Sequence, residues 1–449
     1  MYDHQVKTEK LPMGRIHNKA IFEQRGFVNV AHTFPEFKET RAWLELAMAR
    51  TCENFLAQTT SDGVQREWSG GYHLGVLADA VEISSRMDEF GVPVPEEFRQ
   101  RIRAMYDYIY GIATPDLGFP MFGDTARPLV EDPDRSTWPL YGALMEATQL
   151  FGDPKYATRA RLDEDALPPP ASHAFPEAGL YALRNGWGQD QIYLALHCSP
   201  PAITSHDQPD NGTFELYAYG RWLMPDSGFY TYGRDPVARA WHRQTQVHQT
   251  LTLDGQDSQE DAKQLLWHTE PAFDALVVEN QSYPNLAHRR TVWFVNKSTD
   301  GRGFFVFLDE ALGDATGQLD LHFQFAPGEL RFDKSSGRAT TTFADANVLV
   351  LPDAAMLRLA EQSEGWFAWQ YGSRRPRPAV RYQHKRAAPV AFLTLVVSYR
   401  GEQAPSAAAP LPADFVIGAD RVVLSVSVFG DTWEVGRDLE QGKAWALSR

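Results

Sequence analysis

The hydrophobic positions in the first third of the chain recur with the period of an α-helix. Residues 33–36 read Thr-Phe-Pro-Glu, whose capping-box spacing predicts a helix start. After them Leu44, Met48 and Phe55 fall on one helical face. Three more helices are predicted, at about residues 72–90, 98–109 and 137–151. Short polar or Gly/Pro-rich loops join these segments, which together predict an array of helical hairpins.

A break in this pattern divides the chain in two. The Pro/Ala-rich stretch 167–179 is the predicted boundary between a helical domain at residues 1–166 and a second domain at residues 167–449. Beyond it, short apolar runs alternate with period two, as β-strands do. These runs lie at residues 193–196, 214–217, 250–253, 319–323, 390–399 and 422–429. No strong helical pattern interrupts them, so we expect a large antiparallel β domain of two packed sheets.

Charge narrows the choice of partners. The 449 residues include 43 Lys and Arg against 58 Asp and Glu, a net charge of −15. That balance argues against nucleic acid or an anionic membrane as a partner. It leaves an acidic substrate possible, because a cleft can be locally basic on an acidic protein. Homo-oligomer formation is left open.

Two cysteines and the N-terminus bear on the compartment. Cys52 and Cys198 form neither a disulfide framework nor a zinc ribbon, and we expect free thiols. The first fifteen residues contain no apolar core of a secretory signal, and no apolar stretch is as long as a membrane span. The localisation is therefore unknown: cytoplasmic is the default expectation, and a periplasmic or secreted location stays open.

Four polar segments hold residues that can carry chemistry. They contribute His17 and Asn18; Glu67, Tyr72 and His73; His206, Asp207, Asp210 and Asp226; and Arg239, His242, Arg243 and His248. Taken singly, each has an ordinary structural explanation. Asn18 can cap a helix, Asp226 can begin a turn, and the arginines can brace a surface. The order of the whole set along the chain is what points to a function.

Together these segments resemble the heparinase II/III-like polysaccharide lyases. The stretches HNKAIFE, FPEFKETRAW, DGVQREWSGGYH, HDQPDNGTFELYAYGRWLMPDSGFYTY and RAWHRQTQVHQTLTLDG occur in the family's order and at similar spacing, from Asn18 through Gly255. The resemblance implies an α+β multidomain fold, in which an N-terminal (α/α) toroid precedes an antiparallel β-sandwich and the active site lies between them. Seventeen residues precede Asn18, fewer than is usual in the family, so an incomplete toroid is one expectation.

The resemblance also implies a reaction, the β-elimination of a uronic-acid-containing glycan such as alginate or a glycosaminoglycan. Asn18 matches the family's carboxylate-binding asparagine, a donor that neutralises charge growing on the uronate. Tyr72 matches the catalytic tyrosine, whose hydroxyl suits a proton donor to the departing oxygen. His206 matches the histidine taken as base or charge stabiliser. Which of Tyr72 and His206 takes the C5 proton depends on the uronate epimer.

Further residues are expected around the substrate and around a metal. The expected substrate contacts are His17, Lys19, Glu67, His73, Arg239 and Arg243. Asp226 and His248 match two of the three metal ligands of related lyases. Gln208 stands where many family members have the third ligand, a histidine. One divalent metal, zinc or similar, is therefore expected here with a structural role.

Two other functions remain in view. A degenerate lyase that binds a glycan without turnover is consistent with Gln208 and with Lys19, which stands where the family often has histidine. An α/α-toroid glycoside hydrolase would need two carboxylates facing each other, for which Glu67 and Asp210 are the candidates. The basic run at residues 374–377 is expected to be a surface loop, which favours weakly sulfated or unsulfated substrates.

Overall fold

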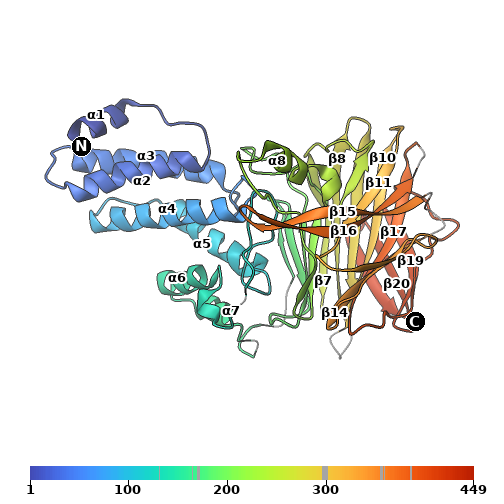
Figure 1. The fold of residues 1–449 in the computed structure, drawn as a ribbon. Helices are drawn as coiled ribbons and strands as arrows, with labels where there is room; N and C mark the ends of the chain where they lie inside the picture. The colour runs from blue at the N-terminus through green and yellow to red at the C-terminus, as the bar shows by residue number, and fades with distance from the viewer. Residues whose placement is uncertain are drawn as a thin grey trace.

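The N-terminal part of the protein is a stack of helices. The structure, a computed structural model, describes residues 1–449 apart from 131, 164, 169–171, 296–301, 354–356, 358 and 385–386. The helices are α1 (Tyr2–Lys10), α2 (Asn18–Thr33), α3 (Thr40–Gln58), α4 (Gly70–Glu89), α5 (Glu96–Ile112), the short turn η1 (Arg135–Thr137), α6 (Tyr141–Phe151) and α7 (Pro154–Arg161). Figure 1 shows α2 to α5 lying side by side at one end of the molecule, with α6 and α7 next to α5. Among the described residues, no helix has both the length and the apolar character needed to cross a membrane.

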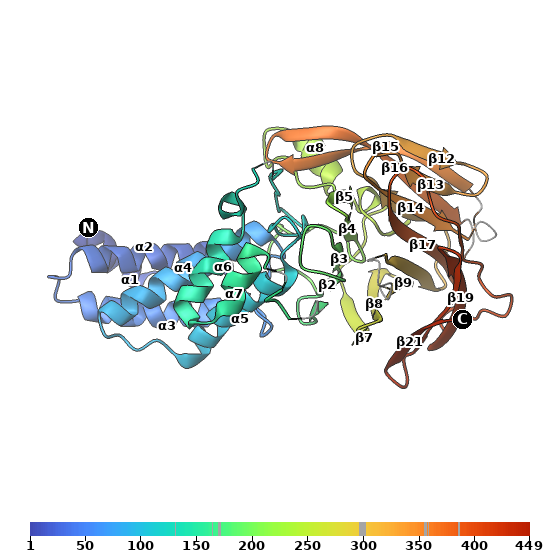
Figure 2. The same cartoon turned by 90° about the horizontal axis from the view of Figure 1, so that it is seen from below.

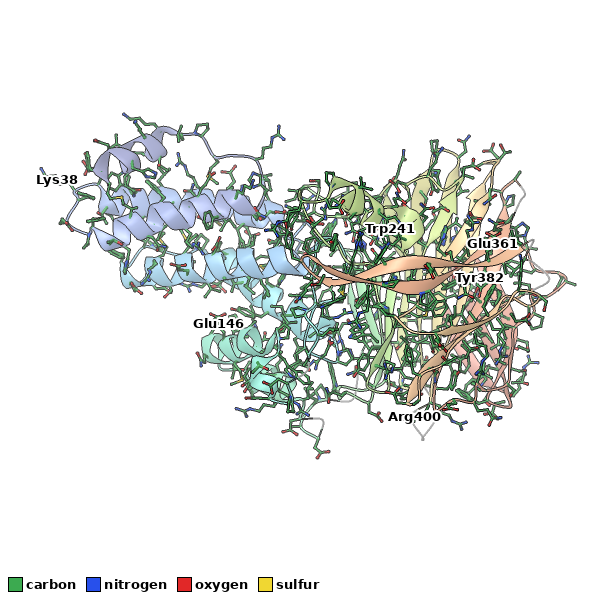
Figure 3. The ribbon with its side chains drawn as sticks, in the orientation of Figure 1. Lys38, Glu146, Trp241, Glu361, Tyr382 and Arg400 are labelled. Atoms are coloured by element: carbon green, nitrogen blue, oxygen red, sulfur yellow. The ribbon has the colours of Figure 1, made fainter. Side chains whose placement is uncertain are left out.

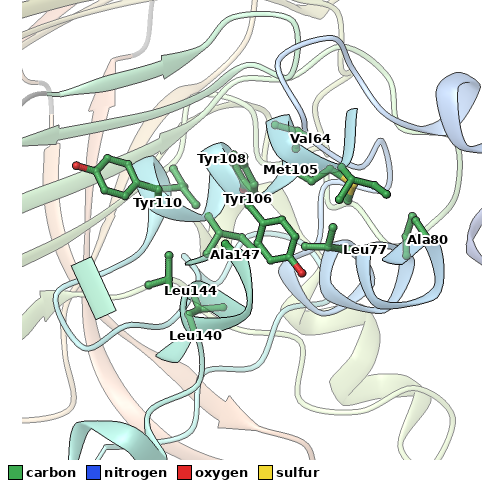
Figure 4. Close-up of a cluster of buried hydrophobic side chains, with 14 of the residues drawn as sticks. Val64, Leu77, Ala80, Met105, Tyr106, Tyr108, Tyr110, Leu140, Leu144 and Ala147 are labelled. Carbon is green, nitrogen blue, oxygen red and sulfur yellow. The ribbon is translucent and has the colours of Figure 1, made fainter. Parts of the chain in front are cut away.

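Helix α5 illustrates why these segments fold as expected. Its apolar residues Phe98, Ile102, Met105 and Ile109 are all buried, as their spacing predicts. Two glutamates in the first turn interact favourably with the positive end of the helix dipole. Figure 4 shows the cluster that α5 forms with α4 and α6, in which the ring of Tyr106 lies between Leu77 and Ala147. This core fixes the helix ends that carry the site.

The predicted helix start at residues 33–36 is wrong. Thr33 ends α2, where its hydroxyl donates to the carbonyl of Asn29, and α3 begins only at Thr40. Phe34 lies outside the helical region of the backbone angles, with φ −123° and ψ 66°. Because Phe34 precedes a proline, helical geometry is disfavoured there. The capping-box pattern therefore falls on a turn between two helices.

The described residues of the remaining chain form four antiparallel sheets. Their strands are β1 (His173–Phe175), β2 (Leu180–Arg184), β3 (Ile192–His197), β4 (Phe214–Ala218), β5 (Arg221–Met224), β6 (Leu251–Leu253), β7 (Ala262–Glu270), β8 (Phe273–Tyr283), β9 (Leu286–Val295), β10 (Phe304–Gly313), β11 (Leu319–Gln324), β12 (Leu330–Asp333), β13 (Arg338–Thr341), β14 (Ala346–Pro352), β15 (Leu359–Gln370), β16 (Ser373–His384), β17 (Val390–Arg400), β18 (Ala407–Ala408), β19 (Arg421–Val428), β20 (Asp431–Asp438) and β21 (Lys443–Ser448). The strand orders are β1-β2-β3-β4-β5, β12-β13-β14-β17-β10-β9-β8-β7, β15-β16-β11-β6 and β18-β19-β20-β21. The β-sandwich is present as expected, with four sheets in place of the two predicted.

Figure 2 shows the sheets packed next to one another on the right, with the helices on the left. In β3, Tyr193 and Ala195 pack into the helical core, whereas Leu194 and Leu196 pack into the core shared with the eight-stranded sheet. The eight-stranded sheet packs its other face against β19 to β21. With both faces covered, β3 is apolar along most of its length. The five-stranded sheet is therefore the joint between the helices and the β-sandwich.

A long hairpin, β15–β16, crosses from the β-sandwich toward the helices (Figures 1 and 2). The short helix α8 (Pro236–His242) packs against it, with Trp241 close to Gly365 of β15 (Figure 3). The prediction that residues 374–377 form a surface loop is wrong, because they belong to β16. Arg377 is buried and donates to the carbonyls of Pro225 at 2.5 Å and Asp226 at 3.0 Å.

Both cysteines are free thiols, as expected. Cys198 is buried, and burial raises the pKa of its thiol to about 12. Such a thiol stays protonated near neutral pH and is not a nucleophile. Neither cysteine contributes to the chemistry described below.

Candidate active site

Three residues named from the sequence meet where helices and sheets join. Asn18 is the first residue of α2, Tyr72 lies in the first turn of α4, and His206 comes from the loop between β3 and β4. The rings of Tyr72 and His206 stack, with centroids 3.9 Å apart. Both are partly exposed, so a ligand can reach them.

Glu67 joins Asn18 to His206. Its carboxylate accepts from the backbone N–H of Asn18 at 2.9 Å and from the Asn18 side chain at 3.5 Å. It also accepts from the Thr204 hydroxyl at 2.9 Å and lies 3.5 Å from Nε2 of His206. Glu67 is fully buried. It therefore positions the residues around it and is shielded from direct substrate contact.

A second tyrosine shares the site with Tyr72. The hydroxyls of Tyr72 and Tyr232 are 3.1 Å apart, and Tyr232 lies in the loop between β5 and α8. Burial raises the pKa of Tyr72, although the hydrogen bond from Tyr232 partly opposes the shift. Burial and the hydrogen bond to Tyr72 raise the pKa of Tyr232. Both hydroxyls thus keep their protons at neutral pH, and Tyr72 has a proton to donate.

Asp124, which the sequence analysis did not single out, holds the other side of His206. One carboxylate oxygen lies 2.9 Å from Nδ1 of His206 and accepts from Arg239 at 2.7 Å. The Asp124 side chain is fully buried. An ionised carboxylate only accepts, so Nδ1 of His206 donates to Asp124, and in the neutral form of the ring Nε2 is the acceptor. An imidazolium formed at His206 would lie between the carboxylates of Asp124 and Glu67.

Gly123 allows this contact. The backbone N–H of Asp124 donates to the carbonyl of His206 at 2.8 Å. Gly123 has φ +61°, and a Cβ there would lie 2.7 Å from the same carbonyl oxygen. Only glycine fits both the left-handed backbone and the close approach. In the sequence, Gly123-Asp124 is typical of a turn. It does not indicate that Asp124 contacts a residue 82 positions away.

The two predicted arginines reach the site with their charges already engaged. Arg239, on α8, pairs with Asp124, and its guanidinium lies 5.2 Å from the ring centroid of Tyr232. Arg243 lies 3.7 Å from Asp124 and donates to the backbone carbonyl of Asp207. Both are partly exposed, at 15% and 26% of the side chain. They line the wall of the site, and only a small part of each side chain stays exposed to an anion.

The other predicted substrate contacts are placed unequally. His17 caps α2 by accepting from the backbone N–H of Lys19 at 3.0 Å, and Lys19 is exposed. His73 is buried in the helical core, 3.2 Å from the carbonyl of Met105, and burial lowers its pKa to about 3. Successive helical residues point about 100° apart, so His73 faces away from the side that Tyr72 presents. The structure does not bring His73 into the site.

A buried group beside the site has the composition of a cation site. Nδ1 of His248 lies 2.7 Å from Asp226 and 3.8 Å from Asp210, and ligand atoms of these three residues lie within 4.8 Å of one another. Burial opposes charge on both Asp226 and His248, but the attraction between the two side chains outweighs it. The pKa of Asp226 is therefore lowered and that of His248 is raised. One Asp210 oxygen and Oε1 of Gln208 are buried without hydrogen-bond partners. These unpartnered oxygens fit a divalent cation.

The structure adds His197 to this region and removes support for the hydrolase. Nδ1 of His197 lies 2.8 Å from Asp210, and His197, Asp207 and Asp210 form a second group whose ligand atoms lie within 4.8 Å. Glu67 and Asp210 are both fully buried, the first bonded to Asn18 and the second to His197. They do not face each other across an open cleft, as paired hydrolytic carboxylates would.

Comparison with known proteins gives the same family on both parts of the chain. The family described as heparinase II/III N-terminus matches residues 14–133, and the family described as heparinase II/III-like, C-terminal, matches residues 167–409. A heparin-sulfate lyase of Pedobacter heparinus is 32% identical over 401 residues, covering 86% of this chain and 59% of that protein. A heparin-sulfate lyase of Bacteroides stercoris is 31% identical, covering 84% and 57%. The chain spans less than two thirds of the length of these relatives.

Solved structures extend the likeness to the fold. The crystal structure of heparan sulfate lyase HepC from Pedobacter heparinus has a TM-score of 0.85 at 29% identity, covering 98% of this chain and 69% of that one. A crystal structure of heparinase III has a TM-score of 0.83 at 26% identity, covering 95% and 68%. The expected order of a helical toroid-type part and a β-sandwich is confirmed.

Proposed function

Because residues 14–133 and 167–409 both match it, the chain belongs to the heparinase II/III-like family, and we propose that it is a glycosaminoglycan lyase acting on heparan-sulfate-type chains by β-elimination. The observation that carries the proposal is the stacking of Tyr72 on His206 at 3.9 Å, with Asn18 tied to the same centre through Glu67. The names of the relatives support a glycosaminoglycan over alginate.

The residues divide the reaction between them. Asn18 binds the uronate carboxylate, where negative charge grows as the C5 proton leaves. Nε2 of His206 takes that proton, and the electrons of the C5–H bond form the new C4–C5 double bond. The C4–O4 bond breaks, and Tyr72 gives its proton to O4. The raised pKa of Tyr72 supports the role of donor, and the two carboxylates beside His206 support the role of base.

Measuring the unsaturated product tests the proposal directly. The protein is incubated with heparan sulfate, heparin, chondroitin sulfate, hyaluronan and alginate while near-ultraviolet absorbance is followed. We expect a rise with heparan sulfate that Tyr72→Phe and His206→Ala abolish. His268→Ala is the control, since His268 lies on β7 and pairs with Glu270. A folded protein that binds glycans without yielding this product would be the glycan-binding form, and the lyase proposal would fall.

We also propose that Asp210, Asp226 and His248 hold one divalent cation, with Gln208 as an added oxygen ligand. The cation would supply positive charge among buried carboxylates, joining the end of β5 to the segment before β6. Its role is structural, because none of these ligands contacts Tyr72 or His206 by a described hydrogen bond. Metal analysis of the purified protein should find about one equivalent, and a chelator should lower the melting temperature. Metal-free protein with an unchanged melting temperature would contradict the site.

A further inference from the structure

The tip of the β15–β16 hairpin lies against the candidate active site. The ring centroid of Tyr371, at the tip, is 6.1 Å from that of Tyr232 and 6.2 Å from that of Phe229. The backbone N–H of Gly372 donates to the carbonyl of Tyr230 at 2.8 Å, which fixes the tip to the loop before α8. Tyr232 in turn reaches the hydroxyl of Tyr72. Tyr371 at the hairpin tip is thus separated from Tyr72 by one side chain, that of Tyr232.

Three arginines surround this tip, each lying over an aromatic ring. Arg234 lies 5.6 Å from the ring centroid of Tyr371, Arg374 lies 4.5 Å from that of Tyr230, and Arg375 lies 4.5 Å from that of Trp369. Within the described part of the chain, none of the three forms an ion pair with a carboxylate. Arg234 and Arg375 are exposed and Arg374 is half-buried.

In a protein with a net charge of −15, these three guanidiniums lie against aromatic rings. A guanidinium that stacks on a ring keeps its N–H edge free for a carboxylate or a sulfate. The ring also limits the motion of the arginine, so less conformational entropy is lost on binding. The exposed face of Tyr371, 41% accessible, can take the apolar face of a sugar.

We propose that Tyr371 and Arg234 form a subsite for the sugar next to the cleavage position, where Arg234 binds an anionic group and Tyr371 stacks on the ring. Arg374 and Arg375 add positive charge on the two faces of the same hairpin. The anion is a sulfate or a carboxylate, which share the geometry that a guanidinium recognises. The inference rests on the proposed lyase function, whose substrate it describes more closely. It also supplies cations that the sequence analysis did not place near the site.

The test is a set of kinetic and binding measurements on Arg234→Ala and Tyr371→Ala. We expect the KM for heparan sulfate to rise about tenfold in each, with kcat within about twofold, as for loss of one partly exposed contact to a charged group. Arg421→Ala is the matched control. Arg421, in β19, also lies over an aromatic ring, that of Trp445 in β21, but within the C-terminal sheet. Chemically desulfated heparan sulfate separates the two anions: if sulfate is the ligand, the effect of Arg234→Ala disappears on it, and if carboxylate is the ligand, the effect remains.

Binding of heparan sulfate to Tyr72→Phe and to Tyr72→Phe/Arg234→Ala, measured by calorimetry, separates this inference from the lyase proposal. Arg234-dependent binding in a protein that forms no unsaturated product would keep the subsite and reject the lyase. Cleavage by the wild type with an unchanged KM in both variants would reject the subsite and keep the lyase. Neither binding nor cleavage of any glycan would reject both.

Discussion

Asp124 is the buried carboxylate on which the orientation of His206 depends, and Asp124→Asn removes its charge without changing its shape. The carboxylate accepts from Nδ1 of His206 at 2.9 Å and from Arg239 at 2.7 Å. An amide at this position retains one acceptor oxygen and presents an NH2 group as the other end. His206 then loses the partner that fixes its tautomer, and Arg239 loses its counter-ion.

The size of the effect follows from burial. Removing one partner of a fully buried pair costs about 3–5 kcal/mol, and hydrogen bonds to charged groups contribute about 1.5–3 kcal/mol each. Asp124 is fully buried, but His206 and Arg239 are 24% and 15% exposed, so water offsets part of the loss. We therefore expect Asp124→Asn to lower the free energy of unfolding by about 2–3 kcal/mol. If a similar amount of orientation is lost in the transition state, kcat falls about 30- to 150-fold.

The assay measures kcat by near-ultraviolet absorbance of the product and stability by urea unfolding. The control is Asp309→Asn, because Asp309 is also a buried carboxylate that joins a histidine and an arginine. It lies 2.7 Å from His288 and 2.6 Å from Arg290, in the β-sandwich. Because His288 and Arg290 are almost fully buried, we expect the control to lose at least as much stability, about 3–5 kcal/mol, and to keep kcat within about twofold. Wild-type kcat in Asp124→Asn, or equal loss of kcat in the two variants, would refute the reasoning.

Three further predictions concern other residues. Tyr72→Phe should lower kcat by at least about 100-fold and leave glycan affinity unchanged by calorimetry, since only the proton donor is removed; a wild-type rate would exclude Tyr72 as the donor. Burial raises the pKa of Asp274 to about 7, so its contribution to stability is lost as pH rises from about 4 through about 7. Asp274→Asn should therefore raise the melting temperature at about pH 8 and change it little at about pH 4, whereas an equal gain at both would contradict the buried carboxyl. Arg377→Ala should cost about 3 kcal/mol in urea unfolding because it leaves buried carbonyls unsatisfied, while Arg374→Ala should cost under about 1 kcal/mol; similar losses would mean that burial does not distinguish the two.

The fold could be predicted where one periodicity dominates. Helix α5 and strand β17 have uniform apolar patterns and were predicted within a few residues. Strand β16 was missed because Pro376 and the arginines before it are typical of a loop. Its residues 373–378 extend beyond the end of β11 and pair with β15 alone, so that edge of the strand tolerates proline. Such a place in a sheet is set by the whole topology, and local sequence does not contain it.

The site could be predicted as far as the family motifs reach. Tyr72 stacks on His206, and Asn18 is joined to His206 through Glu67, because each residue stands at a fixed place in its motif. Asp124 lies outside those motifs and acts through contacts with distant segments. Glu67 is predicted to contact the substrate directly. Because it is buried, it instead holds Asn18 and His206 in position. Burial depends on packing, which the sequence alone did not give.

In the proposed lyase, the contact between Asp124 and His206 makes catalysis depend on both parts of the chain. Asp124 belongs to the segment after α5 and His206 to a loop of the five-stranded sheet, so neither part holds the whole candidate site alone. A chimera that took its helices from one relative and its sheets from another would keep every motif intact. It would still misplace His206 unless the loop carrying Gly123 matched the loop it receives. These two loops are therefore expected to change in concert as the family diverges, and turnover serves as a readout of whether the halves have docked correctly.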